Sequence, residues 1–287
     1  MTFKYLLSVA VFFSISIFAV ANVHASQECA VSDSGHLWLI NRDSMLCADY
    51  VPNNLCKYKG VHVRAVASNA FTQMLAAMES DDIYGLRLQS AYRTYGHQRT
   101  IFDRKKQELS AKGYSEIEAE STASMSIHPP GASEHQLGLA LDVATDGTLT
   151  QAFGETKAGK WLEENCHTFG FIIRYPNLKT DITKIVYEPW HLRYVGVPHS
   201  TIMKNLNLTL EEYLLYIKQV KTYMFWAEDT DYFLVCYSHS LPSDLPPQTV
   251  DVSSLSPSKS EYIITLRKTY PDVWESTTEK GLSETAP

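Results

Sequence analysis

The stretch Ser133-Glu-His-Gln-Leu-Gly-Leu-Ala-Leu-Asp142-Val-Ala144 predicts a turn that leads into a strand. Beyond Gly138, large aliphatic residues alternate with small ones and one carboxylate. The large side chains that share one face are Leu139, Leu141 and Val143. The residues of the other face are Ala140, Asp142 and Ala144. This segment is therefore expected to pack one apolar face into a core and to turn an acidic face toward a cleft.

Around this strand, helical and extended patterns are spread along the chain without a regular β-α-β alternation. An amphipathic helix is expected where apolar residues recur at helical spacing, at Phe71, Met74, Leu75 and Met78. Further helices are expected over 96–112, 157–168 and 210–220, and a strand over 171–175. The pattern favours an α+β fold in which helices flank an antiparallel sheet.

The motif Glu188-Pro-Trp-His191 lies between two short strand-like runs, 185–187 and 192–195. Pro189 has no N–H to donate to a ladder, so we expect one strand that is interrupted at the motif. Past residue 220, the pattern predicts a hairpin over 223–237, a Ser/Pro-rich linker over 238–260, a last strand over 261–268 and a frayed tail over 275–287. Residues 26–220 are thus expected to form the main domain, and 221–287 a small C-terminal β appendage with a tail.

The N-terminus has the layout of a secretory signal peptide, residues 1–25. One early cation, Lys4, precedes an apolar run over 6–21, and Val23-His-Ala25 offers small or β-branched residues for a cut after Ala25. The alternative is an uncleaved anchor, because the run approaches the roughly 20 residues that cross a bilayer. The signal implies a secreted or extracytoplasmic protein of the cell envelope, associated with a membrane only if the segment stays uncleaved.

Composition limits the classes of partner. The chain has 287 residues, 45% of them hydrophobic and 20% charged, which is typical of a globular protein. Its 25 basic and 32 acidic residues give a net charge of −7, which argues against binding to nucleic acid. None of the five cysteines forms a C-x-x-C pair, so a cysteine zinc site has no support. Cys47 and Cys56 are close enough in sequence to close a loop, and the pairing stays open.

Three residues offer two imidazoles and one carboxylate: His135, Asp142 and His191. This donor set suits zinc with one coordination position left for water, and Glu188 adds a carboxylate beside it. On a regular strand, residues seven apart point to opposite faces, so His135 and Asp142 can meet only if the chain turns between them. Gly138 is placed to permit that turn.

Four blocks of the sequence resemble the signature of VanY-type D-alanyl-D-alanine carboxypeptidases. These are the segments 90–98 (SAYRTYGHQ), 130–142 (PGASEHQLGLALD), 169–176 (FGFIIRYP) and 187–196 (YEPWHLRYVG). That family belongs to a group of zinc peptidases that includes lysostaphin, the D-Ala-D-Ala dipeptidases and the hedgehog signalling domain. The resemblance covers about residues 37–215 and implies a hedgehog/D-Ala-D-Ala peptidase-like fold. One departure is Lys184, where the family often has Gly.

The resemblance also implies the roles of individual residues. His135, Asp142 and His191 are expected to bind Zn²⁺, with Glu188 as the catalytic base. The residues expected to contact the C-terminal end of a peptide substrate are Arg93, Gln98 and Ser133. A planar guanidinium such as that of Arg93 can bind a terminal carboxylate with two hydrogen bonds. Two further arginines of the blocks, Arg174 and Arg193, suit structural pairing as well as catalysis and stay unassigned.

These expectations combine into a secreted zinc carboxypeptidase that removes a C-terminal D-alanine from peptidoglycan stem peptides. Whether the penultimate residue is D or L stays open, because the same blocks serve both activities. One alternative is an endopeptidase that has the same metal site. Another is a non-catalytic module that binds the cell wall, although Glu188 speaks against it because a purely structural metal site has no use for an unligated base.

Overall fold

The structure is a computed structural model that describes residues 34–227 and 231–269. The predicted signal peptide, residues 1–25, and the predicted tail, 275–287, lie outside the described residues. Within the described ranges, no helix combines the length and the apolar character that crossing a membrane requires.

A four-stranded antiparallel sheet with the order β3-β4-β6-β5 forms the centre of the fold. Its strands are β3 (Arg87–Ser90), β4 (Ala140–Ala144), β5 (Phe171–Tyr175) and β6 (Glu188–Tyr194). A short hairpin, β1 (Leu55–Tyr58) and β2 (Val61–Arg64), precedes it in the chain. The predicted α+β class with an antiparallel sheet is confirmed.

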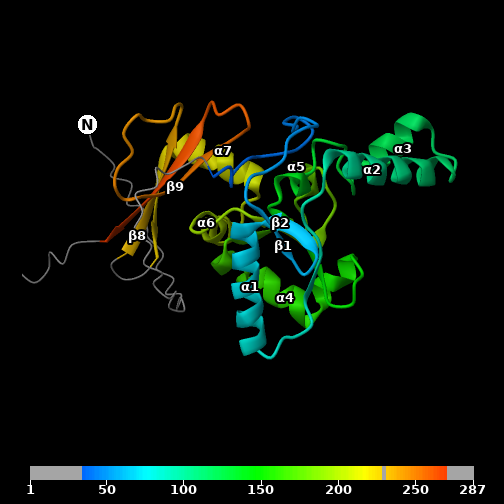
Figure 1. The fold of residues 1–287 in the computed structure, drawn as a ribbon, viewed down its shortest axis with the longest axis horizontal. Coiled ribbons are helices and arrows are strands. Elements are labelled where there is room, and N and C mark those ends of the chain that lie inside the picture. The colour runs from blue at the N-terminus through cyan, green and yellow to red at the C-terminus, as the bar shows by residue number, and fades with distance from the viewer. Residues whose placement is uncertain (1–33, 228–230, 270–287) are drawn as a thin grey trace, which may run out of the picture.

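Helices surround the central sheet, and α2 and α3 project from one end of the molecule (Figure 1). The α-helices are α1 (Ala65–Ser80), α2 (Tyr95–Ser110), α3 (Glu116–Ala123), α4 (Lys157–Asn165), α5 (Thr180–Thr183), α6 (His199–Leu206) and α7 (Leu210–Val220). Three 3₁₀ turns are η1 (Glu134–Leu137), η2 (Gln151–Glu155) and η3 (Cys166–Phe169). The predicted helices over 96–112, 157–168 and 210–220 correspond to α2, to α4 with η3, and to α7.

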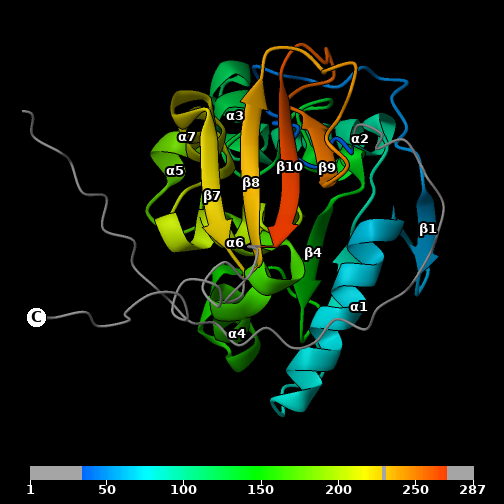
Figure 2. The same cartoon turned by 90° about the vertical axis from the view of Figure 1, so that its left-hand side faces the viewer.

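A second four-stranded antiparallel sheet lies at the end opposite α2 and α3 (Figure 1). Its strand order is β7-β8-β10-β9 (Figure 2). Its strands are β7 (Thr222–Trp226), β8 (Asp231–Ser238), β9 (Thr249–Ser254) and β10 (Tyr262–Thr269). The predicted hairpin and last strand are confirmed as β7, β8 and β10. The expectation of a linker over 238–260 is wrong in part, since β9 lies within it.

The main core contains the apolar face of α1 and the aliphatic face of β4. Phe71, Met74 and Met78 are buried in the same cluster as Leu139 and Leu141. This is the outcome that the helical and the alternating patterns of the sequence predict, because each element buries the side on which its large side chains repeat.

A second core joins α7 and the C-terminal sheet to the central sheet. Leu210 and Ile217 of α7 are buried in one cluster with Val235 of β8, Ile263 of β10 and Ile172 of β5. The hydrophobic contacts are therefore continuous across residue 220, where the sequence pattern places a domain boundary.

One local expectation differs from the structure, and one pairing that the sequence left open does not occur. The strand at the motif is not interrupted: β6 runs from Glu188 to Tyr194, and the ladder adapts to Pro189 by a register shift against β5 between Ile173 and Tyr175. Cys47 and Cys56 are both free and close no loop.

Candidate active site and metal centre

Three elements bring the predicted metal ligands together. His135 comes from η1, Asp142 from β4 and His191 from β6, and Asp142 and His191 are direct partners in the β4–β6 ladder. Gly138 ends η1 in the left-handed conformation with φ of +68°, which makes the turn between His135 and Asp142. One ligand atom from each residue lies within 4.8 Å of the others, and all three residues are buried. The predicted convergence therefore occurs.

The orientation of the three side chains suits a metal ion. His135 Nε2 lies 3.1 Å from Asp142 Oδ2, and His191 Nδ1 lies 3.0 Å from Asp142 Oδ1. The other ring nitrogen of His135, Nδ1, lies 2.6 Å from the carbonyl oxygen of Ala91. When Nδ1 donates to that carbonyl, the lone pair of Nε2 is left facing the carboxylate. Two imidazoles and one carboxylate in this arrangement are a donor set for zinc.

The surroundings of the predicted metal ligands shift their pKa values in different directions. Burial opposes ionisation of Asp142, but His135 and His191 outweigh it and hold the pKa of the carboxyl far below its usual value. Burial lowers the pKa of His135, so its ring is neutral, as a metal ligand must be. Burial also opposes charge on His191, but Asp142 and Glu188 outweigh it and raise the pKa of that ring, so binding of a metal ion there would displace a proton.

Glu188, at the start of β6, is the fourth group of the cluster. Its Oε2 lies 3.6 Å from His191 Nδ1. Burial raises its pKa, and Asp142 adds to this, while His191 and Arg93 oppose it, giving about 8 without a metal ion. A bound divalent cation would favour the carboxylate form again. Glu188 thus stands beside the donor set as a carboxylate that is free to accept a proton.

The predicted substrate contacts lie in the same place. Arg93 NH2 lies 3.6 Å from Asp142 Oδ2, and the guanidinium donates to Gln98 Oε1 at 2.7 Å and to Ser90 Oγ at 3.1 Å. The amide nitrogen of Gln98 donates to the carbonyl oxygen of His128 at 2.6 Å. Both ends of the Gln98 amide are thus engaged within the protein, so its geometry favours orienting Arg93.

A cavity of about 410 Å³ contains all seven predicted residues: Arg93, Gln98, Ser133, His135, Asp142, Glu188 and His191. Trp190 also lines it. Two lining residues that sequence reasoning left out are His128 and Tyr175, whose Nε2 and hydroxyl oxygen lie 2.8 Å apart. Burial, chiefly, lowers the pKa of His128 to about 3, so its ring is neutral. The sequence could have pointed to Tyr175 only through its place in the 169–176 block. Nothing in the sequence around His128 indicates that it lines the cavity.

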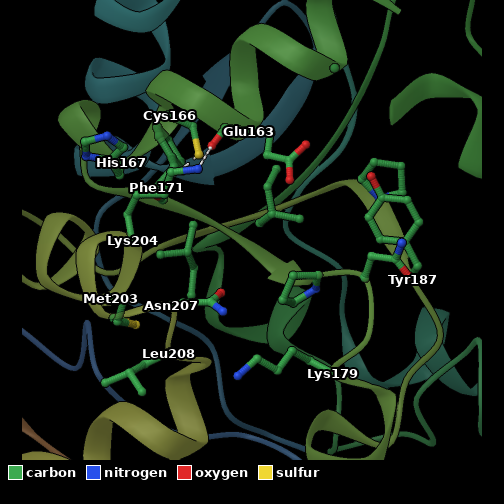
Figure 3. Close-up of a pocket in the computed structure, with 16 residues that line it drawn as sticks. Glu163, Cys166, His167, Phe171, Lys179, Tyr187, Met203, Lys204, Asn207 and Leu208 are labelled. Atoms are coloured by element: carbon green, nitrogen blue, oxygen red, sulfur yellow. Dashed lines mark hydrogen bonds between the residues drawn. The ribbon is translucent and has the colours of Figure 1, made fainter. Parts of the chain in front are cut away.

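A second cavity, of about 120 Å³, lies among α4, β5 and α6 and lacks the metal ligands (Figure 3). Its reactive atom is the thiol of Cys166, which faces the carbonyl oxygen of Phe171 at 3.6 Å. Burial raises the pKa of this thiol to about 12, so it stays protonated and unreactive. The chemistry of the molecule is therefore in the larger cavity.

Lys184, the departure from the family pattern, follows α5 with φ of +62°. This is the left-handed region in which glycine is favoured, so the lysine takes the turn that a glycine would make. The substitution leaves the following strand, β6, in register with β4 at His191.

Comparisons with known proteins agree with this site. Residues 60–197 match the model of the family described as VanY, D-alanyl-D-alanine carboxypeptidase. The chain is 39% identical over 197 residues to YodJ of Bacillus subtilis, whose name describes it as a carboxypeptidase, covering 64% of this chain and 68% of YodJ. It is also 39% identical over 178 residues to a D-alanyl-D-alanine carboxypeptidase of Enterococcus faecalis, covering 62% of this chain and 65% of that protein. The chain thus spans about two thirds of the length of these relatives.

Solved structures give the same picture. VanYB in complex with D-alanine-D-alanine has 39% identity and a TM-score of 0.57, covering 63% of this chain and 97% of that one. A mutant of the D,D-pentapeptidase VanY from a VanB-type resistance cassette, in complex with Zn(II), also has 39% identity and a TM-score of 0.57. The match covers 63% of this chain and 99% of that one. The LD-carboxypeptidase LdcB follows at 38% identity and a TM-score of 0.54, covering 62% of this chain and 84% of that one. The chain belongs to the VanY family of zinc-dependent D-alanyl-D-alanine carboxypeptidases.

Proposed function

We propose that this protein is a secreted carboxypeptidase that removes the C-terminal D-alanine from peptidoglycan stem peptides. The observation that carries the proposal is the position of Arg93. Its guanidinium lies in the same cavity as the three metal ligands and Glu188, close to Asp142. A cation in this place can bind the free carboxylate that marks the end of a peptide.

The residues of the cavity divide the chemistry among themselves. His135, Asp142 and His191 would hold the zinc ion, which when bound polarises a carbonyl and makes water more acidic. Glu188 accepts the proton of the attacking water and delivers it to the leaving amine. Arg93 binds the terminal carboxylate and so places the last peptide bond near Glu188, while Gln98 keeps the guanidinium in position through its 2.7 Å hydrogen bond. The products are free D-alanine and a peptide shortened by one residue.

Release of D-alanine from synthetic stem peptides tests the proposal. Purified full-length protein is mixed with a pentapeptide ending in D-Ala-D-Ala and with a tetrapeptide ending in one D-Ala after an L-centre, with and without a chelator. Release from the pentapeptide indicates D,D-activity, and release from the tetrapeptide indicates L,D-activity. Release from neither by the zinc-loaded protein would overturn the proposal and favour a non-catalytic wall-binding module.

A second pair of substrates separates the carboxypeptidase from an endopeptidase. The same peptides with a C-terminal amide lack the charge that Arg93 binds, so they should be poor substrates. Replacing Arg93 by Met should lower kcat/KM for the free acids by on the order of 10–100-fold, the loss expected for charge-assisted hydrogen bonds. Arg99→Met is the matched control, because Arg99 is an exposed residue of α2. Equal cleavage of acid and amide would favour the endopeptidase.

Secretion rests on the N-terminal pattern, namely Lys4, the apolar run and the Val-His-Ala25 ending. Sequencing the N-terminus of the protein recovered from its producing cells tests it. A mature chain that begins at Ser26 supports cleavage and release. A chain that retains residues 1–25 and sediments with membranes would favour the uncleaved anchor.

A further inference from the structure

Glu134, the residue before the metal ligand His135, lies in a buried cluster of charges behind the metal site. Its Oε1 lies 2.8 Å from Arg174 Nε and 2.8 Å from Arg193 NH1. The side chains of all three residues are at most 1% exposed. Because Glu134 and His135 are neighbours in the single turn η1, whatever fixes the Glu134 carboxylate also fixes the backbone that presents His135.

Arg174, on β5, is itself held from outside the central sheet. Its NH1 and NH2 donate to the two carboxylate oxygens of Glu211 at 3.0 and 2.7 Å, a paired geometry that fixes the orientation of the guanidinium. Glu211 is in the first turn of α7, the helix that shares a hydrophobic core with the C-terminal sheet. A chain of ion pairs therefore leads from α7 through Arg174 to Glu134.

Arg193, on β6, is likewise held from outside the central sheet, by the segment 34–39. Its NH2 donates to the carbonyl oxygens of His36 and Trp38 at 2.9 and 3.0 Å. That segment is bound to β9, since the amide of Leu37 donates to Ser253 Oγ at 2.9 Å. Both arginines that hold Glu134 are thus fixed by elements that lie outside residues 60–197, the part matched by the family model.

The charges of the cluster balance, with two arginines and two glutamates. Removing the charge of Glu211 leaves one guanidinium in excess in a buried place, and an uncompensated buried charge forces its neighbours to rearrange. Arg174 Nε lies 2.8 Å from Glu134 Oε1, so a rearrangement of this guanidinium acts directly on the Glu134 carboxylate and on the turn η1 that carries it.

We propose that Glu211 is a positioning residue of the active site, acting through Arg174 and Glu134 to hold the turn that presents His135 to the metal. The C-terminal helix and sheet are then a support of the metal centre. The inference rests on the proposed function for its turnover readout, whereas zinc affinity reports on it independently of any substrate.

Two neighbouring glutamates of α7 provide the test. Glu211→Gln removes the charge that pairs with Arg174, whereas the matched control Glu212→Gln removes a charge of the same helix turn that pairs with Lys179 and caps the helix with Thr209. The dissociation constant for zinc is measured by competition with a chromogenic chelator, kcat and KM with a stem peptide, and the free energy of unfolding with urea, all on the full chain.

For Glu211→Gln we expect zinc affinity and kcat to fall about tenfold each, the lower end of the range for residues that orient metal ligands, with KM within about twofold. Glu212→Gln should leave zinc affinity and kcat unchanged even where it lowers stability. If both variants lose only stability, and by similar amounts, Glu211 is merely structural and the proposal is overturned.

Glu211→Asp keeps the test decisive if Glu211→Gln does not fold. It retains the charge but shortens the side chain by one methylene, which prevents the paired geometry with Arg174. An intermediate loss of zinc affinity supports the proposal, and wild-type zinc affinity contradicts it. A loss of zinc affinity in either variant supports the positioning role even if the wild-type protein releases no D-alanine. The positioning role can therefore be tested separately from the proposed function.

Discussion

Two buried glutamates at the centre of this molecule have opposite surroundings. Glu134 lies between two arginines, and these outweigh the effect of burial and lower its pKa to about 2. Glu188 lies beside the metal ligands, and burial raises its pKa to about 8 against the opposing charges of His191 and Arg93. The side chains are 0% and 9% exposed, so burial alone does not separate them.

The difference shows how compensation of charge assigns a role to a buried acid. A carboxylate held by two guanidinium groups stays ionised and has no proton to exchange, so Glu134 can only support structure. A carboxylate with weaker compensation is not locked in its ionised form, so it can take up and release a proton, which general acid–base catalysis needs. Glu134, in the cluster behind the metal site, therefore has a structural role, whereas Glu188, in the cavity, can take part in catalysis.

The largest expected effect is the loss of turnover when Glu188 is replaced. Glu188→Gln should lower kcat by about 10²–10⁴-fold, because a general base is lost, while the three metal ligands are untouched. Peptide hydrolysis and zinc content are measured on the same sample. Unchanged turnover, or loss of zinc together with turnover, would remove the distinction between Glu188 and the ligands.

On the structural side, Glu134→Gln should lower the free energy of unfolding by about 3–5 kcal/mol at pH 7, since two arginines are left buried without their shared partner. Urea denaturation measures the effect. Glu155→Gln is the control: that glutamate is 84% exposed and pairs with Lys160, so its replacement should change stability by less than about 1 kcal/mol. Equal effects of the two substitutions would mean that the buried cluster does not stabilise the fold.

The pH dependence of stability sharpens the comparison further. Because the pKa of Glu134 is lowered by folding, its contribution is present above its unfolded pKa of about 4.5 and is lost as pH falls toward about 2. Wild-type protein should therefore lose on the order of 3 kcal/mol more than Glu134→Gln across this interval. Urea titrations at a series of pH values measure the difference. Parallel acid curves for the two proteins would contradict the lowered pKa.

The smallest effect is expected at the turn that joins the two clusters. Gly138→Ala should destabilise the protein by about 1–2 kcal/mol, because φ is +68° and a β-carbon would lie 3.1 Å from side-chain atoms of Arg64 and Leu55. Since the turn carries both Glu134 and His135, zinc affinity should fall with stability. Gly113→Ala, also at positive φ but with nothing within 4 Å, should change stability alone. Unaltered zinc affinity in Gly138→Ala would show that the turn tolerates a shift.

Local patterns determined a large part of the fold and of the site in advance. The alternation in β4, the helical spacing in α1 and the capping box of α7 each follow from short-range geometry that a sequence displays directly. The donor set of His135, Asp142 and His191 could be inferred because its members occur in short motifs whose residue types suit a metal and which resemble the signature blocks of the family. The glycine at 138 even indicated where the chain must turn.

The tertiary structure decided what depends on pairing across long separations. β9 forms in a Ser-rich stretch because β10 provides a partner, and β6 continues through Pro189 because the ladder can shift its register. His128 enters the cavity through its contact with Tyr175, 47 residues away. The ion pair of Arg174 with Glu211 likewise joins two segments that no local pattern connects. Sequence specifies which groups are available and how each element presents them, whereas the energy of burying a charge depends on the neighbours that folding brings to it.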